Sequence, residues 1–165
     1  LLGTLVDISK LDAGVITPDI GVFAVADLLD NLAVEYRQQA KSLGLRLGFV
    51  ASSALVKSDI HLLARVLRNF LSNAIRYTEP GGRIVLGCRR QGHTLRIGVW
   101  DTGSGIAEDK QQEIFQEFKR GDHKRQDQGL GLGLAIVDKI TRILRHQVCV
   151  MSRPGHGSLD RKSVV

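Results

Sequence analysis

The hydrophobic positions of the chain recur every three or four residues in several stretches, which is the spacing of an amphipathic α-helix. The first stretch ends before Gly14, a residue that often follows a helix, and its apolar positions are Leu1, Leu5, Ile8 and Leu11. After Pro18 a second stretch runs to about Gly44 and carries Leu28, Leu29, Leu32, Tyr36 and Ala40. These patterns predict the tail of one helix over residues 1–12 and a second helix that ends near residue 44.

A third amphipathic helix is predicted up to about residue 78, because Ser58 or Asp59 can cap its first turn and the sequence Pro-Gly-Gly at 80–82 forms a turn after it. Its apolar face carries Leu63, Leu67, Phe70 and Ala74. Two more helices are expected, one over about 107–118 and one that follows the glycine-rich start at 129 and ends near 144. The polar stretch 119–128 between them lacks periodicity and predicts a loop.

Short runs of β-forming residues predict strands at 45–50 and 54–57, and a hairpin of 83–90 with 93–100 across Gln91-Gly92. Residues 147–152 and the last residues of the chain resemble closing strands. Strands and helices do not alternate regularly. The pattern therefore predicts an α/β (α+β) two-layer sandwich, with one mixed β-sheet and helices packed on one face.

Length and composition indicate a single globular domain. The 165 residues are 43% hydrophobic and 24% charged, and no apolar run approaches the roughly 18–20 residues that span a membrane. The net charge of +6 suits a polyphosphate, a nucleic acid or an anionic surface. Because the basic residues are scattered and aromatics make up only 5%, a solvated basic surface is the favoured interpretation, and nucleic acid or membrane contact is not expected.

Two cysteines, Cys88 and Cys149, lie far apart in the sequence without a second cysteine or a histidine at metal-ligand spacing. They are interpreted as reduced core thiols in strands of a cytosolic protein rather than as zinc ligands. No secretory signal peptide is recognised at the start of the chain, which does not begin with Met. We expect a cytoplasmic fragment whose parent can carry a membrane anchor elsewhere.

The first candidate for chemistry is a pair of asparagines in the third helix. Asn69 and Asn73 are four residues apart, so they lie on the same side of the helix, at the border of its apolar face. Arg65 and Arg76 flank them, and Tyr77 follows. An amide oxygen can ligate Mg²⁺, which usually takes few protein ligands together with substrate phosphates. Half-exposed asparagines with local hydrogen bonds are the alternative.

The second candidate is Asp101, which directly follows a predicted strand and precedes Thr102-Gly103-Ser104-Gly105-Ile106. A carboxylate at a strand end accepts hydrogen bonds and suits the exocyclic amine of adenine, while glycines let a flat ligand approach. A simple tight turn is one alternative. Another is an aspartic protease, because Asp-Thr-Gly-Ser is the active-site signature of that class, which needs two such carboxylates and hence a symmetric dimer here.

The third candidate is the alternation of Gly129, Gly131 and Gly133 with leucines at the start of the last helix. Exposed N–H groups at a helix start favour anions, and glycines admit phosphates. The spacing is not that of a Rossmann fingerprint, since Leu134 occupies a glycine position, and no Gly-Lys-Ser/Thr of a P-loop follows. A flexible hinge is the alternative, and the preceding polar loop could close over a ligand as a lid.

Together, the motifs resemble the ATP-binding domain of sensor histidine kinases, of the GHKL (Bergerat) superfamily. LRNFLSNAIRYT is similar to the N-box, DTGSGI to the first glycine box, IFQEFKR to the phenylalanine box and GLGLGLAI to the second glycine box. LVDISKLDAG resembles the end of the dimerisation helix. The resemblance implies that 1–14 ends the phosphoacceptor helix and that 15–165 is the ATP-binding catalytic domain, with an ATP lid at about 119–132. A weaker similarity points to hybrid kinases.

The resemblance also implies a role for each matching residue. Asp101 accepts the adenine amine, Asn73 holds Mg²⁺ with support from Asn69, and Arg76 and Tyr77 face phosphates and ribose. Arg120 reaches the γ-phosphate. The implied catalytic residues are Asn69, Arg76 and Arg120, and the other implied ATP-binding positions are Gly103, Gly105, Ile106, Gly129, Leu130, Gly131, Leu132, Gly133, Leu134 and Ser158. Phe115 and Phe118 are expected to anchor the lid.

One position predicts the reaction type within that superfamily. The members that hydrolyse ATP have a glutamate general base where this chain has Asn69, and asparagine cannot take a proton. The resemblance therefore implies transfer of the ATP γ-phosphoryl group to a histidine, for relay to the aspartate of a response-regulator receiver domain. None of the five histidines lies in the acceptor pattern. The acceptor is expected upstream, in this protein or its dimer partner, so this chain binds ATP without phosphorylating itself.

Two departures from the family pattern concern the C-terminal part. Arg145-His146 stand where glycine is usual after the last helix, and Asp160 stands where an aromatic is usual. They place the last strand in doubt, not the pocket. A module of the same fold that binds ATP without transferring phosphate stays open as the alternative function, because it would share Asn73, Asp101 and the glycines.

Overall fold

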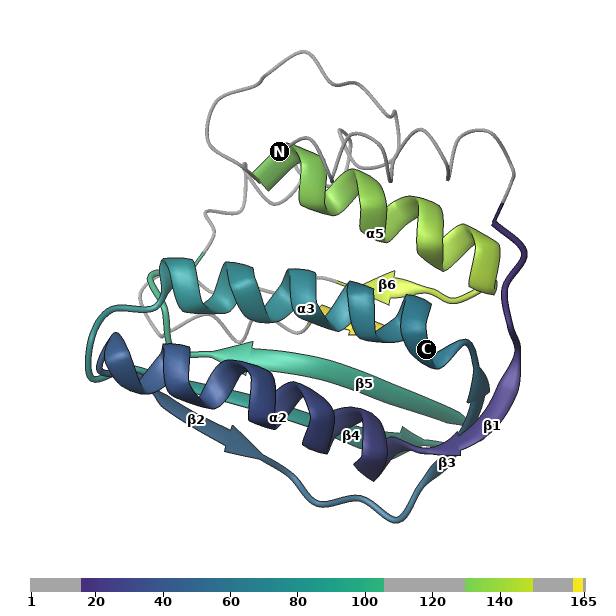
Figure 1. The fold of residues 1–165 in the computed structure, drawn as a ribbon, viewed down its shortest axis with the longest axis horizontal. Coiled ribbons are helices and arrows are strands. Elements are labelled where there is room, and N and C mark those ends of the chain that lie inside the picture. The colour runs from purple at the N-terminus through teal and green to yellow at the C-terminus, as the bar shows by residue number, and fades with distance from the viewer. Residues whose placement is uncertain (1–15, 106–129, 150–161, 165) are drawn as a thin grey trace.

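The computed structural model describes residues 16–105, 130–149 and 162–164. Its helices are α2 (Val25–Ser42), α3 (Ile60–Tyr77) and α5 (Leu130–Leu144). Its strands are β1 (Gly21–Ala24), β2 (Arg46–Phe49), β3 (Leu55–Ser58), β4 (Arg83–Gln91), β5 (Thr94–Asp101), β6 (Val148–Cys149) and β7 (Lys162–Val164). Figure 1 shows α2 and α3 side by side across one face of the sheet, with α5 alongside α3.

The main sheet has five strands in the order β2-β4-β5-β7-β6. Only the β2–β4 pair is parallel, so the sheet is mixed. The predicted fold class, a two-layer sandwich with helices on one face of a mixed sheet, is therefore confirmed. One detail differs: the predicted strand at 54–57 pairs with β1, which the sequence pattern did not indicate, in a separate two-stranded sheet.

The predicted hairpin forms one residue further along the chain than expected. β4 continues to Gln91 and β5 begins at Thr94, so the two-residue turn is Gly92-His93 rather than Gln91-Gly92. Gly92 has φ +59°, a conformation that costs glycine little and that hairpin turns of this length require. The shift places Gln91 opposite Thr94 and Asp101 opposite Ile84.

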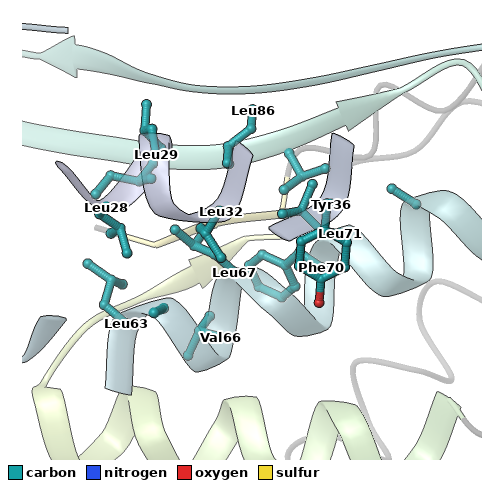
Figure 2. Close-up of a cluster of buried hydrophobic side chains, with 14 of the residues drawn as sticks. Leu28, Leu29, Leu32, Tyr36, Leu63, Val66, Leu67, Phe70, Leu71 and Leu86 are labelled. Carbon is teal, nitrogen blue, oxygen red and sulfur yellow. The ribbon is translucent and has the colours of Figure 1, made fainter. Parts of the chain in front are cut away.

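The core lies between the helices and the sheet. The labelled side chains in Figure 2 come from α2, α3 and β4, and they are Leu28, Leu29, Leu32, Tyr36, Leu63, Val66, Leu67, Phe70, Leu71 and Leu86. Ile136, Val137 and Ile140 extend this core from α5. Alternate residues of β4 and β5, such as Ile84, Leu86, Ile97 and Val99, are buried in the same cluster, which fixes the register of the hairpin.

Several predictions fall on residues outside the described ranges: the helices at 1–12 and 107–118 and most of the lid, 119–129. The last lid positions, 130–132, belong to the first turn of α5. Cys88 and Cys149 are free thiols in β4 and β6, half-buried rather than deep in the core. Within the described ranges, no helix is long and apolar enough to cross a bilayer, and no cluster of three or more His, Cys, Asp or Glu side chains could hold a metal.

Candidate functional site

The asparagine pair lies in the C-terminal half of α3, where the helix leaves the centre of the core. Asn73 is 9% exposed, and Asn69 is half-buried one turn earlier. The Nδ2 atom of Asn73 is one of two buried side-chain polar atoms in the described part of the chain that lack a hydrogen-bond partner. A buried amide atom of this kind costs stability unless a ligand or ion completes its contacts.

The start of α5 lies against Asn69. A methyl group at position 133 would lie 2.5 Å from Oδ1 of Asn69 and 2.6 Å from its Nδ2, so only glycine leaves room for the amide. Gly133 is in the first turn of α5, whose N–H groups have no partners within the helix and attract anions. The contact therefore places this anion-attracting helix start beside Asn69, although the two residues lie 64 positions apart in the chain (133 − 69 = 64).

Asp101 ends β5 and is 8% exposed. Its Oδ1 accepts a hydrogen bond from the backbone N–H of Gly103 at 2.8 Å, which fixes the turn of the chain after the strand. A methyl group at position 103 would lie 2.5 Å from the carbonyl oxygen of Tyr77, so Gly103 joins this turn to the end of α3. Gly105 has φ +79°, a left-handed conformation that favours glycine.

Thr102 connects the turn after β5 to the neighbouring strand β4 through two hydrogen bonds. Its N–H donates to the carbonyl of Arg83 at 2.9 Å, and its hydroxyl accepts from the N–H of Arg83 at 2.8 Å. Asp101 is thus held by a strand, by its own turn and by the end of α3. Such a carboxylate is positioned to receive a hydrogen-bond donor from a ligand with little loss of conformational entropy.

The two residues that end α3 are exposed. The guanidinium carbon of Arg76 lies 5.8 Å from the ring centroid of Tyr77, within the range of a cation–π contact, and Tyr77 is 39% exposed. An exposed cation and a phenol beside the buried groups can meet the charged and sugar parts of a nucleotide.

The structure thus brings two groups of predicted residues to the C-terminal half of α3. Asn69 meets Gly133 of α5 there, and Tyr77 meets Gly103 of the turn after β5. Asn73 lies between them on the helix. Leu134 is buried, and Leu130, Gly131 and Leu132 lie in the first turn of α5. Ile106, Arg120, Gly129 and Ser158, with Phe115, Phe118 and Asp160, lie outside the described residues.

The amino-acid pattern did not single out Thr78. It follows α3, is 7% exposed, and its Oγ1 is the other buried side-chain atom without a partner in the described part of the chain. A threonine after a helix usually indicates only a helix end, and although Thr78 closes the N-box-like segment LRNFLSNAIRYT, that resemblance gave it no role. Burial without a partner is visible only in the fold.

Comparison with known proteins identifies the family of the chain. Residues 58–159 match the family model described as histidine kinase-, DNA gyrase B- and HSP90-like ATPase. The sensor protein SrrB of Staphylococcus aureus is 35% identical over 161 residues, which is 96% of this chain and 28% of SrrB. The chain therefore spans less than a third of the curated relatives that it matches.

Solved structures share the fold. Full-length ShkA, in complex with AMPPNP, aligns over 98% of this chain and 35% of its own with a TM-score of 0.78 and 24% identity. The catalytic domain of the histidine kinase ThkA aligns over 88% of this chain and 92% of its own, with a TM-score of 0.69 and 21% identity. The histidine kinase AdeS of Acinetobacter baumannii aligns over 99% of this chain and 73% of its own, with a TM-score of 0.72 and 19% identity.

Proposed function

The chain belongs to the family of histidine kinase-, DNA gyrase B- and HSP90-like ATPases, and we propose that it is the catalytic domain of a sensor histidine kinase that transfers the γ-phosphoryl group of ATP to a histidine. ATP binding follows from the family, and homology to sensor kinases from the match to SrrB. The observation that carries the proposal is the contact of Asn69 with Gly133, which joins a polar helix face to an anion-attracting helix start.

In this proposal Asp101 recognises the adenine base through a hydrogen bond. Its Oδ1 already accepts from Gly103, and a carboxylate oxygen has a second lone pair, so the group can also accept the exocyclic amine of adenine. Gly103 and Gly105 shape the turn beside the base, and Tyr77 and Arg76 face the ribose and phosphates. The 8% exposure of Asp101 supports this role, because a hydrogen bond is electrostatically stronger away from water.

Asn73 and Asn69 hold the metal and the phosphates. A carboxamide presents an oxygen or a nitrogen on either side of its plane, so the unpartnered position at Asn73 fits a ligand to Mg²⁺ after a half-turn of the amide. Mg²⁺ held by these asparagines would supply positive charge that neutralises the phosphates during transfer. The N–H groups at the start of α5 bind phosphate oxygens, and Arg120 and Gly129 are proposed to act from the lid.

The side chain of Asn69 directs the reaction toward transfer rather than hydrolysis. An amide has no basic site for the proton of an attacking water, whereas an imidazole acceptor needs no deprotonation by the kinase. We further propose that the acceptor histidine lies in the phosphoacceptor helix that 1–14 would end, in the same protein or its dimer partner. A receiver domain would then take the phosphoryl group onto an aspartate.

Calorimetric titration with ADP, or with a non-hydrolysable ATP analogue, in the presence of Mg²⁺ tests the proposal. We expect saturable binding by the parent chain and a loss of at least tenfold in affinity for Asn73→Ala and Asp101→Ala, since each removes a charged or metal-linked contact. Asn31→Ala and Asp30→Ala are the matched controls, because both residues are exposed on α2. A folded parent that binds no nucleotide would refute the proposal.

Phosphoryl transfer requires a second experiment with labelled ATP. The chain is mixed with the dimerisation segment of its parent protein, which is expected to carry the acceptor histidine. Kinase activity is supported if label appears on that segment in the mixture and no label appears on this chain when it is incubated with ATP by itself. ATP binding without transfer to any histidine would indicate the non-catalytic ATP-binding module instead.

A further inference from the structure

Thr78 carries a buried hydroxyl for which the fold provides no partner. The residue is 7% exposed, and its backbone N–H donates to the carbonyl of Ala74 at 3.0 Å, but its Oγ1 makes no hydrogen bond within the described part of the chain. An unsatisfied buried hydroxyl destabilises the folded protein, because it has lost its hydrogen bonds to water without replacement. Valine has nearly the same shape and would avoid that cost.

The side chain of Thr78 lies beside the turn that carries Asp101. Its Cγ2 is so close to Gly82 that a methyl group at position 82 would overlap it, and that methyl group would also lie 3.2 Å from Oγ1 of Thr102. The preceding residue, Tyr77, contacts Gly103 through its carbonyl oxygen. Because the methyl branch faces Gly82, the hydroxyl takes a different staggered position on the same carbon.

Other buried or tightly packed hydroxyls of the structure are satisfied. Oγ of Ser58 is 2.8 Å from Nε2 of His146, and Oγ1 of Thr141 donates to the carbonyl of Val137 at 2.8 Å. The hydroxyl of Thr102, the neighbour of Thr78, accepts from Arg83. The two unpartnered atoms, on Asn73 and Thr78, lie at the same end of α3. One ligand bound at that end of the helix could supply partners for both atoms.

We propose that the Thr78 hydroxyl is a further binding group for the adenine base, acting directly or through one ordered water. The inference rests on the proposed nucleotide site. Asp101 can only accept hydrogen bonds, so it pairs with the exocyclic amine of the base. A hydroxyl can donate, so Thr78 complements a ring nitrogen, which only accepts. The buried hydroxyl is retained at a cost to the ligand-free protein because the bound base completes its hydrogen bonding.

The test compares Thr78→Val and Thr78→Ser with the parent, by calorimetry with ADP and Mg²⁺ and by thermal unfolding without ligand. For Thr78→Val we expect ADP affinity to fall about fivefold to tenfold, the loss of one hydrogen bond. The melting temperature of the ligand-free protein should stay the same or rise, since the unsatisfied group is gone. Thr78→Ser keeps the hydroxyl and should bind ADP within about threefold of the parent.

Thr141→Val is the matched control, because its hydroxyl is buried and already bonded within α5. It should lower the melting temperature slightly and leave ADP binding unchanged. Unchanged ADP affinity in Thr78→Val, or a melting temperature that falls by several degrees, would overturn the role of the hydroxyl and leave the nucleotide site intact. A parent chain that binds no ADP would overturn both, and the calorimetry of the parent distinguishes the two failures.

Discussion

The two ends of α3 contrast in how their polar groups are satisfied. At the first end, Oδ1 of Asp59 accepts from the N–H groups of His61 and Leu62 at 2.9 and 3.0 Å, and its Oδ2 accepts from Asp19 at 2.8 Å. At the other end, Asn73 and Thr78 each keep a buried atom without a partner in the described part of the chain.

That difference separates structural groups from ligand-binding groups on one helix. A carboxylate that completes its hydrogen bonds inside the protein stabilises the fold and has little left to offer a ligand. Buried polar groups that lack a hydrogen-bond partner, and glycines at positions with no room for a side chain, lower stability unless a bound ligand compensates for them. Mutations at the first end should therefore change stability alone, and mutations at the second should change binding.

The largest effect is expected from Gly103→Ala. The added methyl group would meet the backbone carbonyl of Tyr77 at 2.5 Å and Oδ1 of Asp101 at 2.8 Å, and the carbonyl belongs to a packed backbone that cannot move aside cheaply. We expect ADP binding to be lost, together with about 1–3 kcal/mol of unfolding free energy. Calorimetry and urea unfolding measure the two effects.

Gly21→Ala is the control for this change, since a methyl group there meets no heavy atom within 4 Å and the residue lies in β1. Wild-type affinity in Gly103→Ala would show that the turn after Asp101 is not part of the binding site.

A smaller loss is expected from Gly133→Ala. Its methyl group would collide with the tip of the Asn69 side chain, which can rotate away, so the backbone need not shift. Stability should change by less than about 1 kcal/mol, while Mg²⁺-dependent ADP affinity should fall about tenfold because Asn69 is displaced. A large loss of stability with unchanged affinity would mean that this contact serves packing only.

At the first end of α3, Asp59→Ala should cost about 1–2 kcal/mol of unfolding free energy, because it removes a helix cap and leaves the N–H group of Asp19 without its acceptor. ADP affinity of the folded protein should stay unchanged. Asp30→Ala, an exposed aspartate on α2, serves as the control in urea unfolding. Weakened ADP binding by Asp59→Ala would contradict the claim that the first end of α3 contributes to stability alone.

The sequence predicted the sandwich, and it singled out residues that the fold brings close together, because both kinds of signal are local. The spacing of Leu63, Leu67 and Phe70 determines which side of α3 is buried, and glycines mark close approaches wherever they lie. It predicted the strand at 54–57 but not its pairing with β1, because that pairing depends on a distant partner rather than on the strand's own pattern (Val22 pairs with Lys57, 57 − 22 = 35 residues away). The missing partner of Thr78 is likewise a property of the fold.

Arg145 was visible in the sequence as a departure from the expected glycine, and the fold gives the physical reason. Arg145 has φ +56°, and the N–H groups of Arg145 and His146 bond the carbonyls of Arg142 and Thr141, the pattern that ends a helix with a left-handed residue. Replacing Arg145 with glycine should stabilise the protein by about 0.5–1 kcal/mol in urea unfolding, with no change in ADP affinity. A loss of stability would show that the arginine side chain contributes more than its backbone costs.

The smallest effect concerns His146, which follows α5. Its Nε2 lies 2.8 Å from Oγ of Ser58, the last residue of β3, shortly before α3 begins. Burial lowers the pKa of His146 below its ordinary value of 6.5, so between the lowered pKa and pH 6.5 the unfolded chain binds more protons than the folded one. This contribution to stability is complete above pH 6.5 and is lost as the pH falls through that window. His146→Gln should flatten the pH dependence of unfolding between pH 7 and about pH 5, whereas His93→Gln, an exposed control in the β4–β5 turn, should not. If both variants follow the parent curve, the contact of His146 with Ser58 is a packing contact whose strength does not depend on protonation.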